Sequence, residues 1–198
     1  MTSRAFTPAN QITILRLIFV PLFAILELGR HYDWSLAVLA LAAVSDVVDG
    51  TVARLFHQES ELGIALDPIA DKVLMAAAFI LLAYHGVLPW WVTILVLSRD
   101  VAMVLTALLI SLVAGYRPFR PTSLGRISTV FQVASVFAGV SYQVRLPLIE
   151  KPVLQLFTLL AAFFTVASGL HYLLVVRQLY AVHPAAETPA NASDPKEK

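Results

Sequence analysis

Long apolar runs alternate with short polar gaps along this chain of 198 residues. A helix that crosses a bilayer needs roughly 20 mostly apolar residues, and six runs approach that length. Charged residues fall in the gaps, which is the distribution that a bilayer imposes. The pattern therefore predicts an all-α, multi-pass integral membrane protein whose six transmembrane helices form one bundle. The expected helices cover residues 10–28, 34–53, 65–83, 89–114, 123–142 and 152–176.

The chain is predicted to be one domain followed by a tail. Residues 1–180 form the six-helix domain, because the connections between the runs are short and no internal repeat is visible. Residues 181–198 are rich in Ala, Pro and charge, with too few large apolar side chains to offset the entropy of ordering them. We expect a disordered cytoplasmic tail there.

The composition supports a membrane protein and excludes several other classes. Hydrophobic residues make up 59% of the chain and charged residues 14%, whereas soluble domains contain roughly 45–50% apolar residues. The formal net charge of +1 offers no field for binding nucleic acid. The chain has no cysteine, so disulfides, thiolate zinc sites and cysteine nucleophiles are excluded.

The distribution of Lys and Arg predicts an orientation, because cytoplasmic helix ends carry an excess of both. More cations lie on the side of the amino terminus, so we expect both termini to face the cytoplasm. Tryptophans and tyrosines gather on the opposite side, as in an interfacial aromatic belt. The cytoplasmic cations are Arg4, Arg54, Arg117, Arg120, Arg126 and Arg177, the opposite ones are Arg30, Arg145 and Lys151, and the aromatic residues are Tyr32, Trp34, Tyr84, Trp90 and Trp91.

Four carboxylates lie in or beside apolar helices, where an unpaired charge costs roughly 2.5–3.5 kcal/mol at the helix centre. Asp46 and Asp49 are three residues apart, and Asp67 and Asp71 are four apart. Each spacing puts a pair on one helix face, and the short turn between the two runs lets these faces meet. Oxygen ligands in this number suit Mg²⁺ or Mn²⁺. We therefore predict a site for two divalent metal ions.

Ion pairing without a metal is the alternative. Arg16, Lys72 and Arg99 lie in neighbouring apolar runs, and any of them could neutralise some of the carboxylates. Four carboxylates at helical spacing favour the metal site.

Two glycines and an arginine surround the carboxylates. Gly50 and Gly63 would let a bulky ligand approach the helix backbone, and Arg54 offers donors in the planar geometry that suits phosphate. Taken singly, such glycines are usually packing positions in membrane helices, and such an arginine is usually an anchor at the cytoplasmic end. Together with the carboxylates they indicate a phosphate-bearing ligand.

These residues, in this order, resemble the signature of the CDP-alcohol phosphatidyltransferase family. All eight fixed positions are filled across 26 residues, namely Asp46, Asp49, Gly50, Ala53, Arg54, Gly63, Asp67 and Asp71. The likeness covers about residues 8–180. Within the family, the chain is similar to the branch that contains phosphatidylglycerophosphate synthases and CDP-diacylglycerol-dependent cardiolipin synthases. Further matching positions are Asn10, Thr13, Arg16, Ser98, Arg99, Asp100, Gly125, Thr129 and Gln132. One departure is Arg126, where that branch usually carries Lys, so the charge is kept and the hydrogen-bond geometry is not.

The resemblance implies an enzyme that transfers the phosphatidyl group of CDP-diacylglycerol to an alcohol and releases CMP. It implies that Asp46, Asp49 and Asp67 bind the two metal ions. Asp71, which also counts among the metal ligands, would accept the proton of the acceptor hydroxyl. The residues expected to bind the cytidine diphosphate are Gly50, Ala53, Arg54 and Gly63.

The acceptor alcohol is less constrained. Arg117, Arg120 and Arg126 flank the start of the fifth run and could bind a phosphate. Ordinary anchoring at the cytoplasmic interface is the alternative for these arginines. We expect glycerol 3-phosphate as acceptor, which gives phosphatidylglycerophosphate. Phosphatidylglycerol, which gives cardiolipin, is the alternative.

Two readings from other classes remain. A cation transporter could use intramembrane carboxylates as its ion path, and a membrane scaffold without activity could keep the helices. The transporter leaves Arg54, Gly50 and Gly63 unexplained, and the complete carboxylate set argues against a scaffold. The expected partners are the two substrates and membrane lipids, with no nucleic acid. A homodimer and the choice between Mg²⁺ and Mn²⁺ stay open.

Overall fold

The computed structural model describes residues 8–56, 61–114 and 123–181, with side chains for residues 17–45, 72–106 and 124–172. The described residues form six helices and no strand, which confirms the all-α class. Each predicted run overlaps one helix, and the ends differ by at most five residues. The helices are α1 (Pro8–Leu28), α2 (Tyr32–Phe56), α3 (Glu61–Tyr84), α4 (Trp90–Ala114), α5 (Ser123–Val144) and α6 (Lys151–Ala181). The predicted tail after Ala181 lies outside the described residues.

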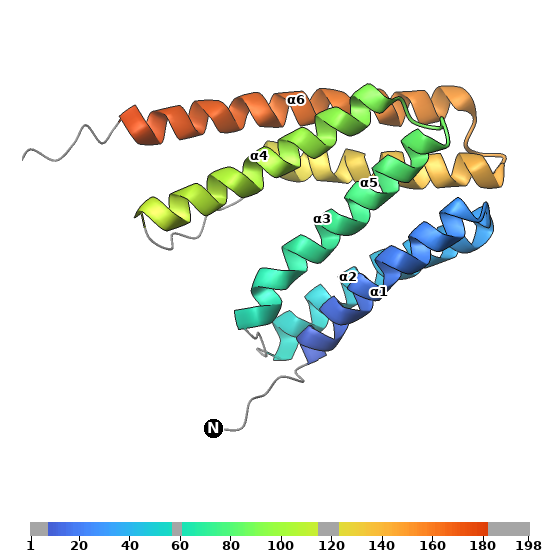
Figure 1. Cartoon of the computed structure of the whole chain (residues 1–198), viewed down its shortest axis with the longest axis horizontal. Helices are drawn as coiled ribbons and strands as arrows, with labels where there is room; N and C mark the ends of the chain where they lie inside the picture. Colours follow the sequence, from blue (N-terminus) through green and yellow to red (C-terminus); the bar gives the residue numbers. More distant parts are fainter. Residues whose placement is uncertain (1–7, 57–60, 115–122, 182–198) are drawn as a thin grey trace, which may run out of the picture.

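Helices that follow one another in the chain run antiparallel, and α3 and α5 each contact three other helices. Helix α5 packs against α2, α3 and α6, while α1 packs against α2 and α3, and α4 packs against α3 and α6. The connections after α1, α3 and α5 gather at one end of the bundle, on the right in Figure 1. We call this the connection end. Helix α2 ends and α3 begins toward the other end.

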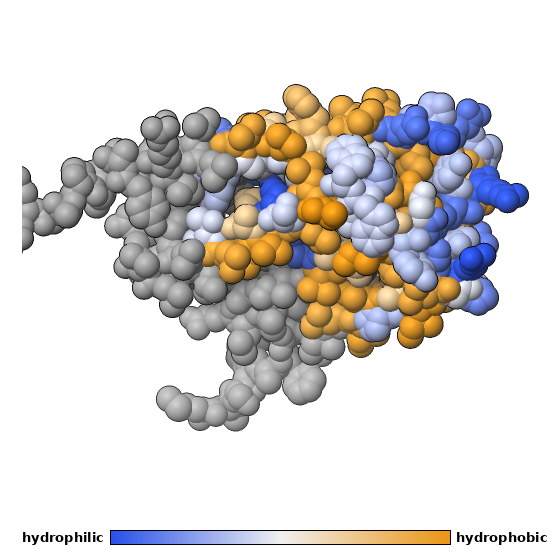
Figure 2. All heavy atoms as spheres, turned by 45° about the horizontal axis from the view of Figure 1, so that its top comes forward, coloured by the Kyte–Doolittle hydropathy of each residue, from blue (hydrophilic) through white to orange (hydrophobic). Residues whose placement is uncertain are grey.

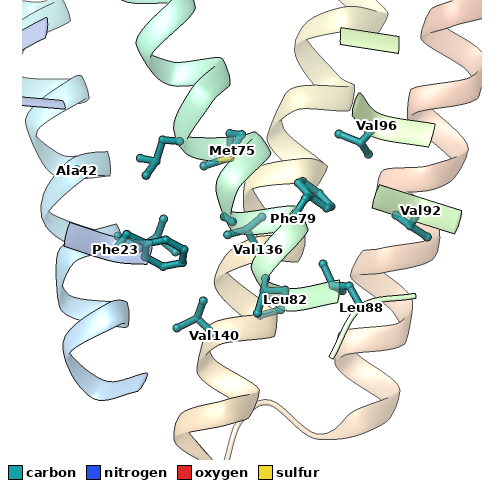
Figure 3. Packing of buried hydrophobic residues seen from close by; sticks show 14 of the residues in the cluster. Phe23, Ala42, Met75, Phe79, Leu82, Leu88, Val92, Val96, Val136 and Val140 are labelled. Atoms are coloured by element: carbon teal, nitrogen blue, oxygen red, sulfur yellow. The ribbon is translucent and has the colours of Figure 1, made fainter. Parts of the chain in front are cut away.

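A hydrophobic core joins the helices near the connection end. Phe23 of α1, Phe79 and Leu82 of α3, Val92 of α4 and Val136 of α5 are all inaccessible to solvent (Figure 3). Lipid chains are as apolar as these side chains, so the hydrophobic effect contributes little between helices in a membrane. Close packing of the core is then the main source of its stabilisation.

The outer surface is more apolar than that of a typical soluble bundle, and the interior contains many polar groups. Every helix exposes large apolar side chains among its described residues, whereas serine, threonine, glutamine and arginine side chains are buried between helices. In Figure 2, hydrophilic residues gather at the right end of the described surface, beside a mostly hydrophobic zone. An extensive apolar surface of this kind indicates contact with lipid. One exposed example from each helix is Ile25, Val44, Ile80, Ile94, Val130 and Phe163.

Two segments of the described chain are long and apolar enough to cross a membrane, Leu124–Val144 in α5 and Lys151–Tyr172 in α6. Shorter apolar segments are found in α1, α2 and α3. Helices α1 to α4 all extend beyond the residues whose side chains are described. The structure therefore supports two membrane spans, and the expectation of six stays a prediction.

Helices α1, α3 and α5 end at the connection end, and each is followed by a tight turn of the same type. Arg30, Gly86 and Arg145 each adopt a left-handed conformation, with φ of 59°, 72° and 63°. After Arg30, the backbone N–H of His31 donates to the carbonyl oxygen of Leu26 at 2.9 Å, and the other two turns make the equivalent bond. This is the Schellman motif, which satisfies the last carbonyls of a helix. The turns make the three connections short and well ordered.

We predict that Gly139→Ala destabilises the bundle. A Cβ atom at this position in α5 would lie 2.9 Å from Cδ1 of Leu82, which the core holds in place. Overpacking of this kind costs about 1–3 kcal/mol, more than the roughly 1 kcal/mol that alanine gains in a helix. Thermal unfolding in detergent should show a lower midpoint. The matched control is Gly169→Ala, because no neighbouring atom of the described residues lies within 4 Å of its new Cβ. Equal midpoints for the two variants would contradict the packing argument.

Candidate active site

The residues of the predicted motif lie in two helices that share a neighbour. Helices α2 and α3 both pack against α1. Since α2 ends at Phe56 and α3 begins at Glu61, the motif positions lie toward the connection between these helices, at the end opposite the connection end. Helix α2 contains Asp46, Asp49, Gly50, Ala53 and Arg54, and α3 contains Gly63, Asp67 and Asp71. The contacts of these eight side chains lie outside the described residues.

The metal site stays a prediction, because the structure describes only the backbone of its four carboxylate residues. Asp46 and Asp49 belong to one uninterrupted helix, and so do Asp67 and Asp71. Residues three or four apart share a helix face, so each pair presents two carboxylates in one register. Four hard oxygen donors without histidine or cysteine suit Mg²⁺ or Mn²⁺. The side chains that the structure describes, which do not include these four, contain no cluster of three or more metal-binding residues.

A network of charged side chains begins at Lys72, the residue after Asp71. Its Nζ lies 2.7 Å from Oδ2 of Asp100, and Nη1 of Arg99 lies 2.7 Å from Oδ1 of the same carboxylate. The Nη2 group of Arg99 donates to the hydroxyl of Ser168 at 2.9 Å. The side chain of Arg99 is 7% exposed and that of Asp100 is 13% exposed. The largely buried carboxylate of Asp100 therefore links α3 to α4, and Arg99 extends the network to α6.

This network bears on the alternative in which cations neutralise the motif carboxylates. For Lys72 and Arg99, the partner that the structure describes is Asp100. The sequence analysis counted Asp100 only as part of a resemblance, although a carboxylate next to Arg99 in an apolar run is itself a signal of pairing. The side chain of Arg16 lies outside the described residues.

A second polar network joins α5 to α6. The amide Nε2 of Gln132 donates to Oγ1 of Thr165 at 2.9 Å and to Oγ of Ser128 at 3.3 Å, and the two hydroxyls lie 3.2 Å apart. All three side chains are buried. Hydrogen bonds between membrane helices contribute on average about 0.6 kcal/mol each. Of these residues, the sequence analysis singled out only Gln132.

The predicted acceptor arginines are only partly visible. Arg126 lies in the first turn of α5 and is exposed, next to the buried Gly125. This position is compatible with binding an anion from solution. Arg117 and Arg120 lie outside the described residues, so the structure does not show whether the three arginines form one cluster.

A buried carboxylate in α1, Glu27, was not among the predicted site residues. Glu27 is inaccessible to solvent, and within the described part of the chain neither of its carboxylate oxygens has a hydrogen-bond partner. Its backbone carbonyl lies 3.1 Å from Nε2 of His85. A glutamate inside the first apolar run was the available signal. Glu27 lies at the connection end, so it belongs to a different part of the molecule from the motif.

Comparison with known proteins identifies the chain's relatives. A family model described as CDP-alcohol phosphatidyltransferase matches residues 6–167. The CDP-diacylglycerol–glycerol-3-phosphate 3-phosphatidyltransferase of Bacillus subtilis is 33% identical over 183 residues, which cover 84% of this chain and 93% of that protein.

Two relatives carry the name cardiolipin synthase (CMP-forming). The one from Streptomyces coelicolor is 38% identical over 65% of this chain and 62% of its own length. The one from Rattus norvegicus is 30% identical over 84% of this chain and 60% of its own length. Mycobacterial relatives match over shorter stretches, and the chain spans about half of their length, 47% in one and 48% in another.

We predict that Asp100→Asn destabilises the bundle, because it leaves the buried Arg99 without its charged partner. Removing one partner of a buried ion pair costs roughly 3–5 kcal/mol. We expect about 3 kcal/mol, since the Lys72 side chain is 34% exposed and water can solvate it. Thermal unfolding in detergent provides the measurement. Ser98→Ala is the control, since its exposed hydroxyl bonds only to the Leu95 carbonyl of its own helix among the described residues. A difference below about 1 kcal/mol between the variants would show that the network is unimportant for stability.

Proposed function

The chain belongs to the CDP-alcohol phosphatidyltransferase family, and we propose that it transfers the phosphatidyl group of CDP-diacylglycerol to an alcohol, releasing CMP. The observation that carries this proposal is the complete motif of eight residues on two consecutive helices, α2 and α3. The Bacillus subtilis relative supports it, because the alignment covers 93% of a protein named for this reaction. A transporter or an inactive scaffold would not require the full motif.

In the proposed reaction, the acceptor hydroxyl oxygen attacks the phosphorus that carries diacylglycerol. The bond between this phosphorus and the oxygen bridging to CMP breaks, and CMP leaves with the bonding electrons. Asp71 accepts the proton of the hydroxyl. Asp46, Asp49 and Asp67, with Asp71 as a further ligand, would hold two Mg²⁺ or Mn²⁺ ions. Such ions supply positive charge that stabilises the diphosphate and the leaving CMP.

The remaining motif residues are proposed to bind the cytidine diphosphate of the donor. Gly50, Ala53 and Gly63 have small side chains, which let a ligand approach the helix backbone. Arg54 lies one helical turn after Gly50 and offers a planar set of donors for phosphate oxygens. Diacyl chains of the donor would stay in lipid, which is consistent with the apolar surface of the described helices.

We propose a multi-pass arrangement with the active site and both termini on the cytoplasmic side. The family is associated with membranes, and two helices of the described chain are long enough to span one. The excess of arginine on the side of the amino terminus supports this orientation. Trp34, Trp90 and Trp91 support it as well, since all three are more than half exposed and lie near the connection end.

Glycerol 3-phosphate is the proposed acceptor. The relative with the most complete alignment cited above is named for this acceptor, and Arg126 is exposed in the first turn of α5, where it could bind a phosphate. Phosphatidylglycerol is the second candidate. The relatives from Streptomyces coelicolor and Rattus norvegicus, both named cardiolipin synthase (CMP-forming), favour it.

The direct test is product analysis with the purified protein and labelled CDP-diacylglycerol. We expect CMP and phosphatidylglycerophosphate when glycerol 3-phosphate is supplied, with no turnover in chelator and recovery on addition of Mg²⁺ or Mn²⁺. Asp71→Asn should abolish turnover, because an amide cannot accept the proton. Cardiolipin from phosphatidylglycerol would instead establish the second acceptor.

Two results would refute parts of this proposal. Absence of CMP release with either acceptor, from a protein that is folded and still binds CDP-diacylglycerol, would refute the transferase. Full turnover in a metal-free preparation would refute the metal site. Ion flux in proteoliposomes without CMP release would favour the transporter.

A separate prediction concerns the acceptor site. Arg126→Ala should raise the KM for the acceptor and leave the affinity for CDP-diacylglycerol unchanged. Losing a charged hydrogen bond to phosphate costs roughly 1.5–3 kcal/mol, which corresponds to a loss of about 10- to 150-fold in kcat/KM. Arg145→Asn is the matched control, since it removes an exposed arginine at the connection end and asparagine tolerates the left-handed backbone found there. An unaltered acceptor KM in Arg126→Ala would assign this arginine to anchoring.

A further inference from the structure

A groove opens at the connection end, away from the proposed active site. It has a volume of about 1010 Å³ and lies between the α3–α4 connection, the end of α5 and the first turns of α6. Asp71 precedes Tyr84, which lines the groove, by 13 residues of one helix. At a rise of 1.5 Å per residue, this places them about 20 Å apart along the axis. A ligand headgroup in the groove would therefore be separate from a headgroup at the motif.

The α6 wall of the groove carries a cation at its mouth and both apolar and polar side chains beyond it, namely Leu154, Gln155, Thr158 and Leu159. Lys151 is the first residue of α6, and Leu159, eight residues later, lies about 12 Å farther along the helix toward the middle of the bundle. Trp90 and Trp91 begin α4 on another wall and are each about half exposed. Tryptophan is typical of the boundary between lipid headgroups and hydrocarbon. The groove thus offers a cation at its mouth and apolar side chains beyond it.

The side chains that line the groove include one lysine, while the adjacent Glu150 does not line it. Of the described residues that line the groove, Lys151 carries an ammonium group and none carries a carboxylate. Within the described side chains, Lys151 makes no ion pair. Gln155, one helical turn later on the same wall, adds a polar amide. An amphipathic anion would match both the cation and the apolar side chains.

We propose that this groove binds an anionic glycerophospholipid of the membrane leaflet opposite the active site. The phosphate lies against Lys151, and one acyl chain follows the apolar side chains of the α6 wall past Leu159. The proposal rests on the membrane orientation given above and not on the chemistry at the motif. It assigns the connection end a lipid-binding role that the proposed reaction does not need.

Tryptophan fluorescence provides the test, because Trp90 and Trp91 line the groove. In a Trp34→Phe background they are the remaining tryptophans of the chain. The protein is placed in phosphatidylcholine nanodiscs with increasing brominated phosphatidic acid, which is neither the proposed donor nor a proposed acceptor. We expect saturable quenching at a small mole fraction of this lipid, and only gradual quenching by brominated phosphatidylcholine. Inorganic phosphate and glycerol 3-phosphate should not compete, since neither has an acyl chain.

Two groove variants and one control make the test specific. Lys151→Gln removes the cation, and Gln155→Glu places a carboxylate one turn away from it. Each should raise the half-saturating fraction of phosphatidic acid by about tenfold or more, the usual effect of losing a charged hydrogen bond. Arg145→Asn removes an exposed cation at the same end that does not line the groove, and it should shift the value by less than about twofold.

Several outcomes would overturn the proposal. Equal shifts in Lys151→Gln and Arg145→Asn would mean that phosphatidic acid responds only to general surface charge. Competition by inorganic phosphate would point to a site for free anions. A dimer that Lys151→Gln dissociates, detected by native mass spectrometry, would show that a second copy of the chain covers the groove. If the protein without groove variants shows saturable quenching by brominated phosphatidic acid but releases no CMP, the proposed function is refuted and the lipid site is supported.

Discussion

Charge pairing in an apolar interior is the constraint on which this bundle depends. An ionised side chain between membrane helices must find a partner, since lipid and apolar side chains provide none. Asp100 meets this requirement for two cations at once, Lys72 from α3 and Arg99 from its own helix, and Arg99 continues to α6. Asp100 thereby ties α4 to α3, and Arg99 extends the same network to α6.

This pairing matters for the site because Lys72 directly follows Asp71. The contact from Lys72 to Asp100 of α4 limits how far α3 can rotate or slide next to Asp71, the last residue of the motif. About one helical turn along α6 from Ser168, buried hydroxyl and amide groups fix α5 against α6 close to Arg126 in the sequence. The proposed chemistry would therefore take place at an end whose helices are positioned by polar contacts, while apolar packing dominates nearer the connection end.

The helices were predictable because bilayer thickness sets the length of an apolar run, and the family was predictable because the eight motif positions are filled. The grouping of the four carboxylates stays a prediction. The identity of helix neighbours was not predictable, so the role of Asp100 emerged only from the structure. The residue that adopts the left-handed conformation after α1 was also not predictable from the local sequence. Glycine usually takes the left-handed position, yet Arg30 takes it and Gly29 precedes it. A Cβ at Gly29 would lie 3.1 Å from the Ile25 carbonyl oxygen, which accounts for glycine there.

The three Schellman turns also have a consequence for biogenesis. They tie the helices into antiparallel hairpins, α1 with α2, α3 with α4, and α5 with α6, joined by residues 29–31, 85–89 and 145–150. In the proposed topology, insertion of a hairpin as one unit moves only its short turn through the hydrocarbon. In each turn, backbone N–H groups already donate to the last carbonyl oxygens of the helix. Fewer backbone groups without a hydrogen bond would therefore cross the hydrocarbon. Left-handed turns that end helices on one side would thus lower the barrier to translocation.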